Sequence, residues 1–208
     1  MKTVHVAVYD TLADWEVGAA TAHIANGAWH REPGTFQVTT VGLTTEPVTT
    51  IGRMRITPDI AIADLDPADS AMLILPGAEL WVGNELNAFA DKAKQFVAAG
   101  VPVAGICGAT FGLAKAGLLD DRAHTSNVAE YLVYSGYSGA DHYVEAPAVT
   151  DRDVITADAM SPFEFAREIF ARLGLYEPHV LEAWYKLFAH SDPAGYATLA
   201  EYEGSHAA

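Results

Sequence analysis

One cysteine stands between an apolar run and a helix-like segment, and its position is typical of a catalytic nucleophile. The stretch from Gly100 to Ala114 reads Gly-Val-Pro-Val-Ala-Gly-Ile-Cys-Gly-Ala-Thr-Phe-Gly-Leu-Ala, and Cys107 is the only cysteine among 208 residues. The apolar run before it predicts a strand that is buried on both faces. Small residues on either side of the cysteine permit a tight turn into the next helix. Such a nucleophile elbow raises the thiol above an α/β sheet, at the N-terminus of a helix.

A thiol in that position is expected to be reactive. A free cysteine has a pKa of about 8.5, and a helix N-terminus can lower it. The N–H groups of Gly108 and Ala109 would point at the sulfur, and those of Gly77 and Gly108 would hold an oxyanion. A buried, inert cysteine is the alternative, but the elbow favours a reactive site. Ala109 departs from the usual elbow, which has glycine at the second position after the nucleophile.

Strands and helices alternate along the chain. Apolar alternation and β-branched residues predict strands over 3–9, 36–41, 72–75 and 101–106, and a hairpin over 148–156. Helices are expected over 15–26, 87–99, from the elbow to 117, from 126 or 127 to about 135, and over 161–173. A small hairpin over 49–57, with Gly52 near its turn, is expected to stand apart from the main sheet.

Several polar residues occupy positions that are typical of helix caps. Asp14 is expected to cap the first helix, and Ser126 or Asn127 the helix after the elbow. Ser161, Pro162 and Glu164 form the pattern of a capping box with proline at the first helical position.

This alternation predicts a three-layer α/β/α sandwich with a mainly parallel, flavodoxin-like sheet. In such sheets the reactive crevice lies at the carboxyl ends of the strands, where Cys107, Gly77 and the turn from Asp10 to Glu16 would meet. Residues 1–208 are interpreted as a single domain with a C-terminal helical extension from about 176 to 208. An apolar stripe that includes Val180 and Trp184 either packs on this domain or forms a dimer contact.

The composition argues against several classes of partner. Twelve Lys and Arg residues against 27 Asp and Glu residues give a formal charge of −15, which would repel nucleic acid and anionic membranes. No apolar run is long enough for a membrane span, and no signal peptide is expected. The single cysteine is compatible with a reducing, cytoplasmic location. No cofactor is expected, and His124 and His142 with Asp141 are too loosely spaced to predict a metal site.

Several motifs, in order along the chain, resemble the ThiJ/PfpI superfamily. This group is related to class I glutamine amidotransferases and includes the Parkinson-associated deglycase branch and the PfpI-type intracellular proteases. The motifs run from about residue 3 to residue 173. They are Ala13-Asp14-Trp15-Glu16, Leu73-Ile74-Leu75-Pro76-Gly77, Ala104-Gly105-Ile106-Cys107-Gly108-Ala109-Thr110, Leu113-Ala114, Ala116-Gly117-Leu118-Leu119, His124-Thr125-Ser126-Asn127, Val154-Ile155-Thr156-Ala157 and Ser161-Pro162-Phe163-Glu164-Phe165-Ala166.

The resemblance implies that Glu16 reaches the sulfur of Cys107 and shares one proton with it. From the residues alone, a glutamate in this position is more often a solvated first-turn residue that interacts favourably with the helix dipole. Two family features are missing: Gly108 stands where the proteases carry a histidine, and the late His-x-Glu pair of the amidotransferases is absent. His124 follows the nucleophile helix and is a candidate general base, or a structural turn histidine. The resemblance and the apolar stripe both imply a homodimer.

Two functions fit these residues. In the first, Cys107 attacks a small reactive carbonyl, amide or related electrophile, Glu16 manages the proton, and backbone amides hold the oxyanion. This is a hydrolase or glyoxalase/deglycase-like reading, with a small molecule as the partner. In the second, Cys107 is oxidised and the protein acts as a redox sensor or stress-protective protein without turnover. A family member that binds a metabolite and has lost catalysis is a third reading.

Overall fold

The computed structural model describes residues 1–206 and contains a seven-stranded sheet with the strand order β5-β2-β1-β6-β7-β9-β8. All neighbouring strands in it are parallel except the pair β8–β9, which forms the predicted C-terminal hairpin. Two further strands pair antiparallel as a separate ribbon, as predicted for the hairpin near Gly52. The strands are β1 (Lys2–Ala7), β2 (Phe36–Gly42), β3 (Val48–Thr49), β4 (Arg55–Ile56), β5 (Ile60–Ala61), β6 (Ser70–Leu75), β7 (Val103–Ile106), β8 (Ala148–Asp151) and β9 (Val154–Ala157).

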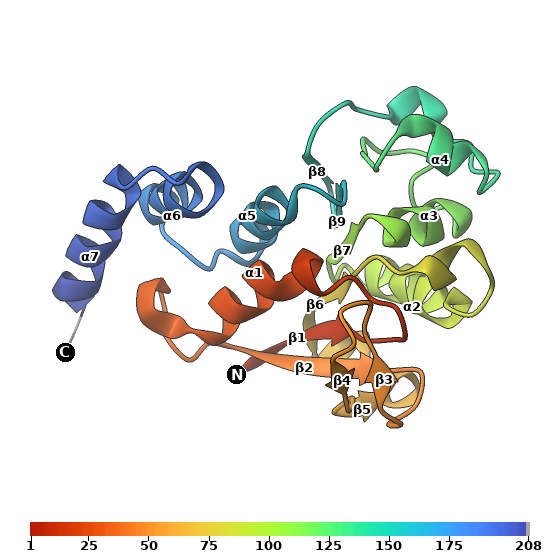
Figure 1. The fold of residues 1–208 in the computed structure, drawn as a ribbon, viewed down its shortest axis with the longest axis horizontal. Helices are drawn as coiled ribbons and strands as arrows, with labels where there is room; N and C mark the ends of the chain where they lie inside the picture. The colour runs from red at the N-terminus through yellow and green to blue at the C-terminus, as the bar shows by residue number, and fades with distance from the viewer. Residues whose placement is uncertain (207–208) are drawn as a thin grey trace.

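Helices cover both faces of this sheet. Figure 1 shows α2 and α3 on one side, and α1 and α5 on the other, with α6 and α7 stacked outside α5. The three-layer α/β/α prediction is therefore confirmed. The α-helices are α1 (Asp14–Ala25), α2 (Asn87–Ala98), α3 (Gly108–Lys115), α4 (Ala129–Val133), α5 (Pro162–Leu173), α6 (Pro178–His190) and α7 (Ala194–His206). The short 3-10 helices are η1 (Gly27–Trp29), η2 (Ile62–Asp64), η3 (Pro67–Asp69), η4 (Glu79–Val82) and η5 (Ala140–His142).

Strand β6 shows how the two cores arise from a period of two residues. Leu73 and Leu75 are buried against the layer that contains α2 and α3, whereas Met72 and Ile74 are buried against α1 and α5. Successive side chains of a strand point to opposite faces, so a central strand that is apolar throughout can serve both cores.

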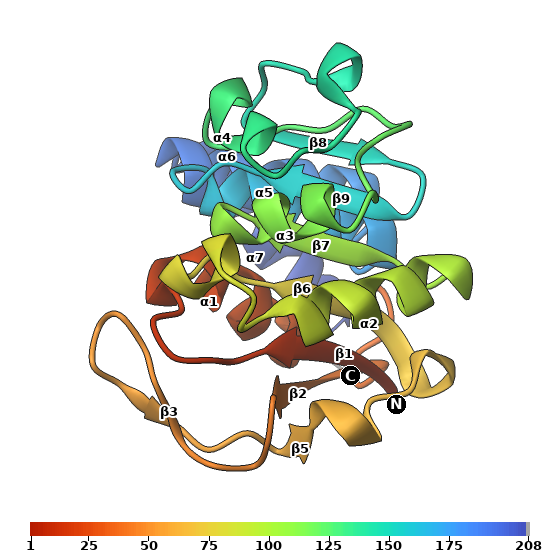
Figure 2. The same cartoon turned by 90° about the vertical axis from the view of Figure 1, so that its right-hand side faces the viewer.

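The sheet register brings the predicted site residues to one edge. In Figure 2, β1, β6 and β7 lie side by side in the middle of the sheet. Leu75 pairs with Gly105, so the chain leaves β6 towards Gly77 close to where it leaves β7 towards Cys107. The parallel topology alone therefore juxtaposes two turns that are 30 residues apart in the sequence.

The side chains that were predicted to cap helices bond to other partners. Asp14 is the first residue of α1, and its Oδ2 accepts a hydrogen bond from the Gly52 N–H at 2.7 Å. Ser161 stands at the N-cap of α5 and Pro162 begins the helix, as predicted, but no capping box forms, because the Ser161 hydroxyl donates to Asp158 and Glu164 accepts from the Tyr185 hydroxyl.

The helix after the elbow was also bounded incorrectly. Helix α4 begins at Ala129 after Val128, and neither Ser126 nor Asn127 caps it. Both side chains instead bond to residues around the elbow, Ser126 to Thr110 and Asn127 to Cys107. These two residues therefore belong to the site and not to a helix terminus.

The C-terminal apolar stripe packs on its own chain. Val180 and Trp184 of α6 are fully buried, in the same core as Phe170 of α5 and Leu199 of α7. The structure divides the C-terminal helical extension into two helices, and the second, α7, has no amphipathic pattern of its own and is held by its contacts with α6. The apolar stripe is consequently buried within its own chain, and it does not supply the dimer contact that was one of its two predicted roles.

Two glycines in the middle of helices provide a matched test of this packing. A Cβ on Gly112 of α3 would collide with the ring of buried Trp81, whereas a Cβ on Gly18 of α1 would meet nothing within 4 Å. We expect Gly112→Ala to lower the free energy of unfolding by about 1–3 kcal/mol through overpacking. Gly18→Ala should raise it by up to about 1 kcal/mol, because alanine is the better helix former. Urea denaturation of both variants measures this, and equal effects would contradict the packing between α3 and η4.

Candidate active site

Cys107 forms the nucleophile elbow that the sequence predicted. It links β7 directly to α3, with φ of 56° and ψ of −121°. A non-glycine residue in this region of the Ramachandran map costs about 1–3 kcal/mol and is held by its surroundings. The Cys107 N–H bonds to the Ala157 carbonyl oxygen of β9 at 3.0 Å, and the Gly108 N–H donates towards the sulfur. The strained turn therefore presents the thiol at the start of a helix, as in other nucleophile elbows.

Gly77 brings Glu16 to this thiol. Its N–H donates to Glu16 Oε2 at 2.5 Å, and its carbonyl oxygen accepts from the Ala13 N–H at 2.9 Å. The first turn of α1 is thus bound to both sides of Gly77. A Cβ on Gly77 would lie 2.7 Å from Glu16 Oε2 and 2.9 Å from the Cys107 sulfur, so only glycine fits between the two groups. The structure therefore brings Glu16, Gly77 and Cys107 together, as the sequence and the resemblance predicted.

A buried polar network supports the turn that carries Gly77. The Tyr9 hydroxyl donates to the Pro76 carbonyl oxygen, and Trp81 Nε1 reaches the same oxygen at 2.9 Å and the Tyr9 hydroxyl at 3.1 Å. Tyr9 and Trp81 are each only 2% exposed. Buried networks whose members are hydrogen-bonded rigidify their surroundings, so this one holds Gly77 against the elbow.

Glu16 is fully buried, and its carboxyl holds a proton more tightly than an ordinary glutamate. Burial raises its pKa from 4.5 to about 7, although the hydrogen bond from the Gly77 N–H opposes the shift. Within residues 1–206, Glu16 Oε1 has no hydrogen-bond acceptor or donor of standard geometry. The carboxyl and the Cys107 thiol nevertheless lie close enough to affect each other's titration through a hydrogen bond.

The thiol itself is harder to ionise than the helix terminus suggested. Burial, and then the charge of Glu16, raise the pKa of Cys107 to about 11, while hydrogen bonds from Asn127 and Gly108 oppose the shift. The expected net lowering was therefore wrong, because desolvation and a like charge outweigh the two donors. Glu16 and Cys107 titrate as a pair that holds one proton between about pH 7 and about pH 11.

Asn127, which was predicted as a helix cap, is a member of the site. Its Nδ2 donates to the Cys107 sulfur at 3.4 Å, and its Oδ1 accepts from the Ala159 N–H at 2.9 Å. The available signal was its place in the His-Thr-Ser-Asn motif, directly after the nucleophile helix and its turn. Periodicity alone could not show that its side chain turns back towards the elbow.

His124 lies in a buried turn and is bonded away from the thiol. Its Nδ1 contacts the Arg122 carbonyl oxygen at 2.9 Å, and its Nε2 contacts the Tyr137 hydroxyl at 3.3 Å. Burial lowers its pKa, which keeps the ring neutral. In the part of the chain that the structure describes, no hydrogen bond joins His124 to Cys107. These contacts fit the structural alternative better than a general base.

The two predicted oxyanion donors already have partners in this structure. The Gly77 N–H is bonded to Glu16, and the Gly108 N–H points at the sulfur. An oxyanion formed next to Cys107 would have to compete with Glu16 for the Gly77 N–H, whereas the Gly108 N–H already faces the reacting sulfur. Gly108 is thus the better placed of the two.

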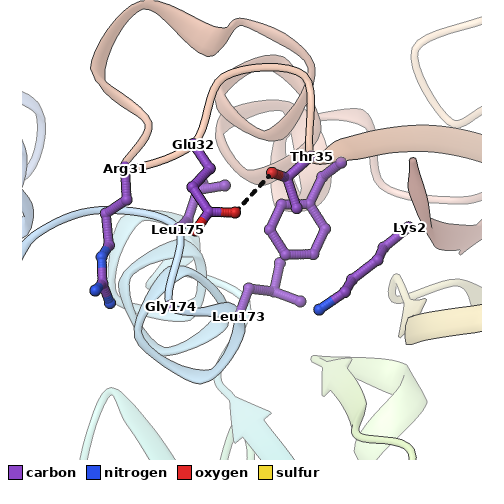
Figure 3. A pocket seen from close by; sticks show the side chains of 8 residues that line it. Lys2, Arg31, Glu32, Thr35, Leu173, Gly174 and Leu175 are labelled. Carbon is purple, nitrogen blue, oxygen red and sulfur yellow. Dashed lines mark hydrogen bonds between the residues drawn. The ribbon is translucent and has the colours of Figure 1, made fainter. Parts of the chain in front are cut away.

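Other features of residues 1–206 do not contribute to this site. A hollow of about 240 Å³ lies at the opposite edge of the sheet, lined by residues such as Lys2, Arg31 and Leu173, and Figure 3 shows its side chains. No group of three His, Cys, Asp or Glu residues in the described chain is arranged to hold a metal ion. None of the described helices is long and apolar enough to cross a membrane.

The fold and the site define an α/β/α protein with a cysteine nucleophile elbow and a buried glutamate beside it. The sequence matches the DJ-1/PfpI family over residues 2–172, and the chain belongs to this family. This confirms the superfamily that the motifs suggested.

Relatives of this chain share nearly its whole length. A protein named uncharacterized protease YoaZ from Bacillus subtilis is 35% identical over 189 residues, which cover 89% of this chain and 90% of the relative. A second one from that organism, named uncharacterized protease YdeA, is 32% identical and covers 88% of each chain. The crystal structure of a thiJ/pfpI family protein from Bacillus anthracis has a TM-score of 0.92 at 34% identity, covering 97% of this chain and 96% of that one. These names point to an enzyme family with hydrolase members.

The raised pKa of Glu16 makes stability depend on pH. Since the folded chain holds this proton more tightly than the unfolded chain, the free energy of unfolding falls as pH rises from 4.5 to about 7. Glu16→Gln removes the titration, so its stability relative to the wild type should increase by at most about 3 kcal/mol across that window. Urea denaturation at several pH values measures this. Glu130→Gln, at an exposed glutamate, is the control, and a pH-independent difference for Glu16→Gln would contradict a raised pKa.

The same variant tests the coupling to the thiol. Because the Glu16 carboxylate raises the pKa of Cys107, Glu16→Gln should move the midpoint of thiol alkylation to lower pH. Iodoacetamide labelling across pH 6–11, followed by mass spectrometry of the peptide that contains Cys107, reports the one cysteine of the chain. A midpoint that stays in place, or moves to higher pH, would show that the carboxylate does not oppose ionisation of the thiol.

Proposed function

We propose that this protein is a cysteine-dependent hydrolase or lyase that acts on small electrophilic carbonyl, amide or related substrates through Cys107 and Glu16. The observation that carries the proposal is the fully buried Glu16 carboxyl, with a pKa of about 7, next to a thiol at a nucleophile elbow. Such a carboxyl is poised between its acid and base forms at neutral pH, which is the condition for efficient proton transfer. The hydrolase names of the relatives support the class of reaction.

The proposed first step is a coupled proton transfer and attack. The Glu16 carboxylate takes the thiol proton while the sulfur lone pair forms a bond to the electrophilic carbon. The carbon–oxygen π bond opens, and its electron pair moves to the oxygen. The Gly108 N–H faces this region and would stabilise the oxyanion, and protonated Glu16 then returns the proton to the oxygen or to a leaving group. One group thus serves as base and then as acid, and His124 is not required.

The raised pKa of the thiol favours turnover over redox sensing. Oxidation by peroxide requires a standing thiolate, whereas a pKa of about 11 keeps Cys107 largely protonated at neutral pH. A nucleophile activated by Glu16 during the attack needs no such standing population. The alternative of a sensor or stress-protective protein therefore has the weaker physical support.

We also propose that the protein works as a homodimer, in the cytoplasm. Trp15 and Met160 are 54% and 89% exposed, and they lie near each other because the Trp15 indole donates to the carbonyl oxygen of Ala159, the residue before Met160. Exposed apolar residues gathered in one place are typical of contact surfaces. A second copy covering them would also shield the thiol from water, and light scattering that detects only monomers would contradict this part of the proposal.

Cys107→Ser tests the enzymatic proposal. Across a panel of methylglyoxal, other small aldehydes, glycated amines, amides and isonitriles, we expect wild-type turnover of at least one class. The serine variant should lose at least about 100-fold in kcat/KM with its fold retained, since a hydroxyl is a far poorer nucleophile here. Circular dichroism checks the fold. Absence of any Cys107-dependent turnover, together with stoichiometric oxidation of the thiol by mild peroxide, would instead establish the sensor.

A further inference from the structure

We propose that Asn127 is a catalytic residue of this site, whose side-chain amide donates a hydrogen bond to the Cys107 sulfur and stabilises its anionic form. The inference rests on the proposed function only in taking Cys107 as the reacting group. Asn127 Nδ2 lies 3.4 Å from the sulfur, within the range of a hydrogen bond to sulfur. The sequence motifs did not predict that the Asn127 side chain contacts the sulfur.

The orientation of the amide is determined by the loop after β9. Asn127 Oδ1 accepts from the Ala159 N–H at 2.9 Å. A backbone N–H can only donate, so the oxygen must face Ala159 and the nitrogen must face the sulfur. The donor is therefore aimed at Cys107 by geometry, and a rotation of the amide by 180° would lose both hydrogen bonds.

Trp15 extends this connection across the mouth of the site. Its Nε1 donates to the Ala159 carbonyl oxygen at 3.0 Å, on the residue whose N–H binds Asn127. A chain of hydrogen bonds thus runs from Trp15, next to Glu16 on α1, through Ala159 and Asn127 to the sulfur. Members of such chains polarise one another, and this chain fixes the loop that orients the amide. Trp15 is accordingly a positioning residue.

The residues before Asn127 restrict its backbone. The Thr125 N–H donates to Thr156 Oγ1 at 2.9 Å, and the Ser126 hydroxyl lies 2.7 Å from the Thr110 hydroxyl. Thr110 Oγ1 in turn donates to the Cys107 carbonyl oxygen at 2.5 Å. Segment 125–127 is therefore anchored both to β9 and to the elbow itself, which is the preorganisation that a catalytic donor needs.

This donor, like the Gly108 N–H, acts on the sulfur in the direction opposite to burial and Glu16. Burial and Glu16 disfavour the thiolate, whereas Asn127 favours it. The hydrogen bond strengthens as negative charge develops on the sulfur, both before attack and when a carbon–sulfur bond breaks to release product. Asn127 is exposed on its outer side, so solvent limits its effect to roughly one pKa unit, or about tenfold in ionisation.

The test compares two variants of Asn127, one of them isosteric, by their alkylation profiles. Asn127→Asp keeps the acceptor for Ala159 but replaces the donor with a negative charge, and Asn127→Ala removes both contacts. We expect Asn127→Asp to slow alkylation of Cys107 at pH 7.5 by at least about tenfold and to move the midpoint to higher pH, with a smaller shift for Asn127→Ala. Trp15→Phe, which lacks the indole donor, should shift the midpoint in the same direction by less.

Val128→Asp is the matched control for added charge. Val128 is the next residue and is 52% exposed, so an aspartate there adds a like charge without touching the sulfur. We expect it to change the alkylation rate by less than about threefold, because solvent screens an exposed charge. Wild-type rates and midpoints in both Asn127 variants, or equal slowing by Val128→Asp and Asn127→Asp, would overturn the proposal.

This readout is independent of any substrate. Alkylation requires only the thiol, so the alkylation profiles decide the role of Asn127 even if the substrate panel shows no turnover. Conversely, Cys107-dependent turnover accompanied by unshifted alkylation profiles in the Asn127 variants would retain the enzyme and reject the role of Asn127. Thermal unfolding confirms that each variant is folded, and Asn127→Ala remains informative if the aspartate variant does not fold.

Discussion

The site depends on a close approach that only glycine permits. Gly77 lies between the Glu16 carboxyl and the Cys107 sulfur, and a Cβ at this position would meet both within 2.9 Å. Its N–H and carbonyl oxygen both bond to the first turn of α1, so this one residue ties three elements together. The turn, the elbow and the helix start each come from a different part of the sequence. Their meeting is a consequence of parallel strands whose carboxyl ends lie at one edge.

The contact between the Glu16 carboxyl and the Cys107 thiol has an electrostatic cost. A carboxyl with no exposed surface beside a partly buried thiol destabilises the charged forms of both groups. Above pH 4.5 the buried Glu16 carboxyl lowers the free energy of unfolding, because the unfolded chain ionises this group more readily than the folded chain does. Perturbed titratable groups concentrate at functional sites, and the pKa of about 7 suits the role of base at neutral pH that we propose for Glu16. The electrostatic strain and the proposed activity thus have the same origin.

Much of the fold could be predicted from the sequence, because its signals are local and periodic. The apolar run before Cys107, the hairpin into β9 and Gly174 at the end of α5 were each determined by the residues themselves. The errors fell on polar side chains such as Asp14, which local rules assign to helix caps. Its actual partner, Gly52, is 38 residues away, and no local pattern encodes that distance. The division of the C-terminal extension into α6 and α7 could not be predicted, because α7 has no periodicity of its own and its burial depends on α6.

In the candidate site, too, local signals identified some residues, whereas the roles of others depend on tertiary contacts. Cys107 and Gly77 could be found because backbone geometry restricts their residue types, and Glu16 because a family motif surrounds it. Asn127 could not be found as a sulfur donor, because its role depends on the Ala159 N–H that turns its amide. Tertiary contacts determine the orientation of a side-chain amide. They also determine that the His124 ring bonds to Arg122 and Tyr137 and not to the thiol. The side-chain amide that donates to the sulfur belongs to an asparagine, so a neutral donor lies beside the thiol, and the proposed mechanism assigns proton transfer to Glu16.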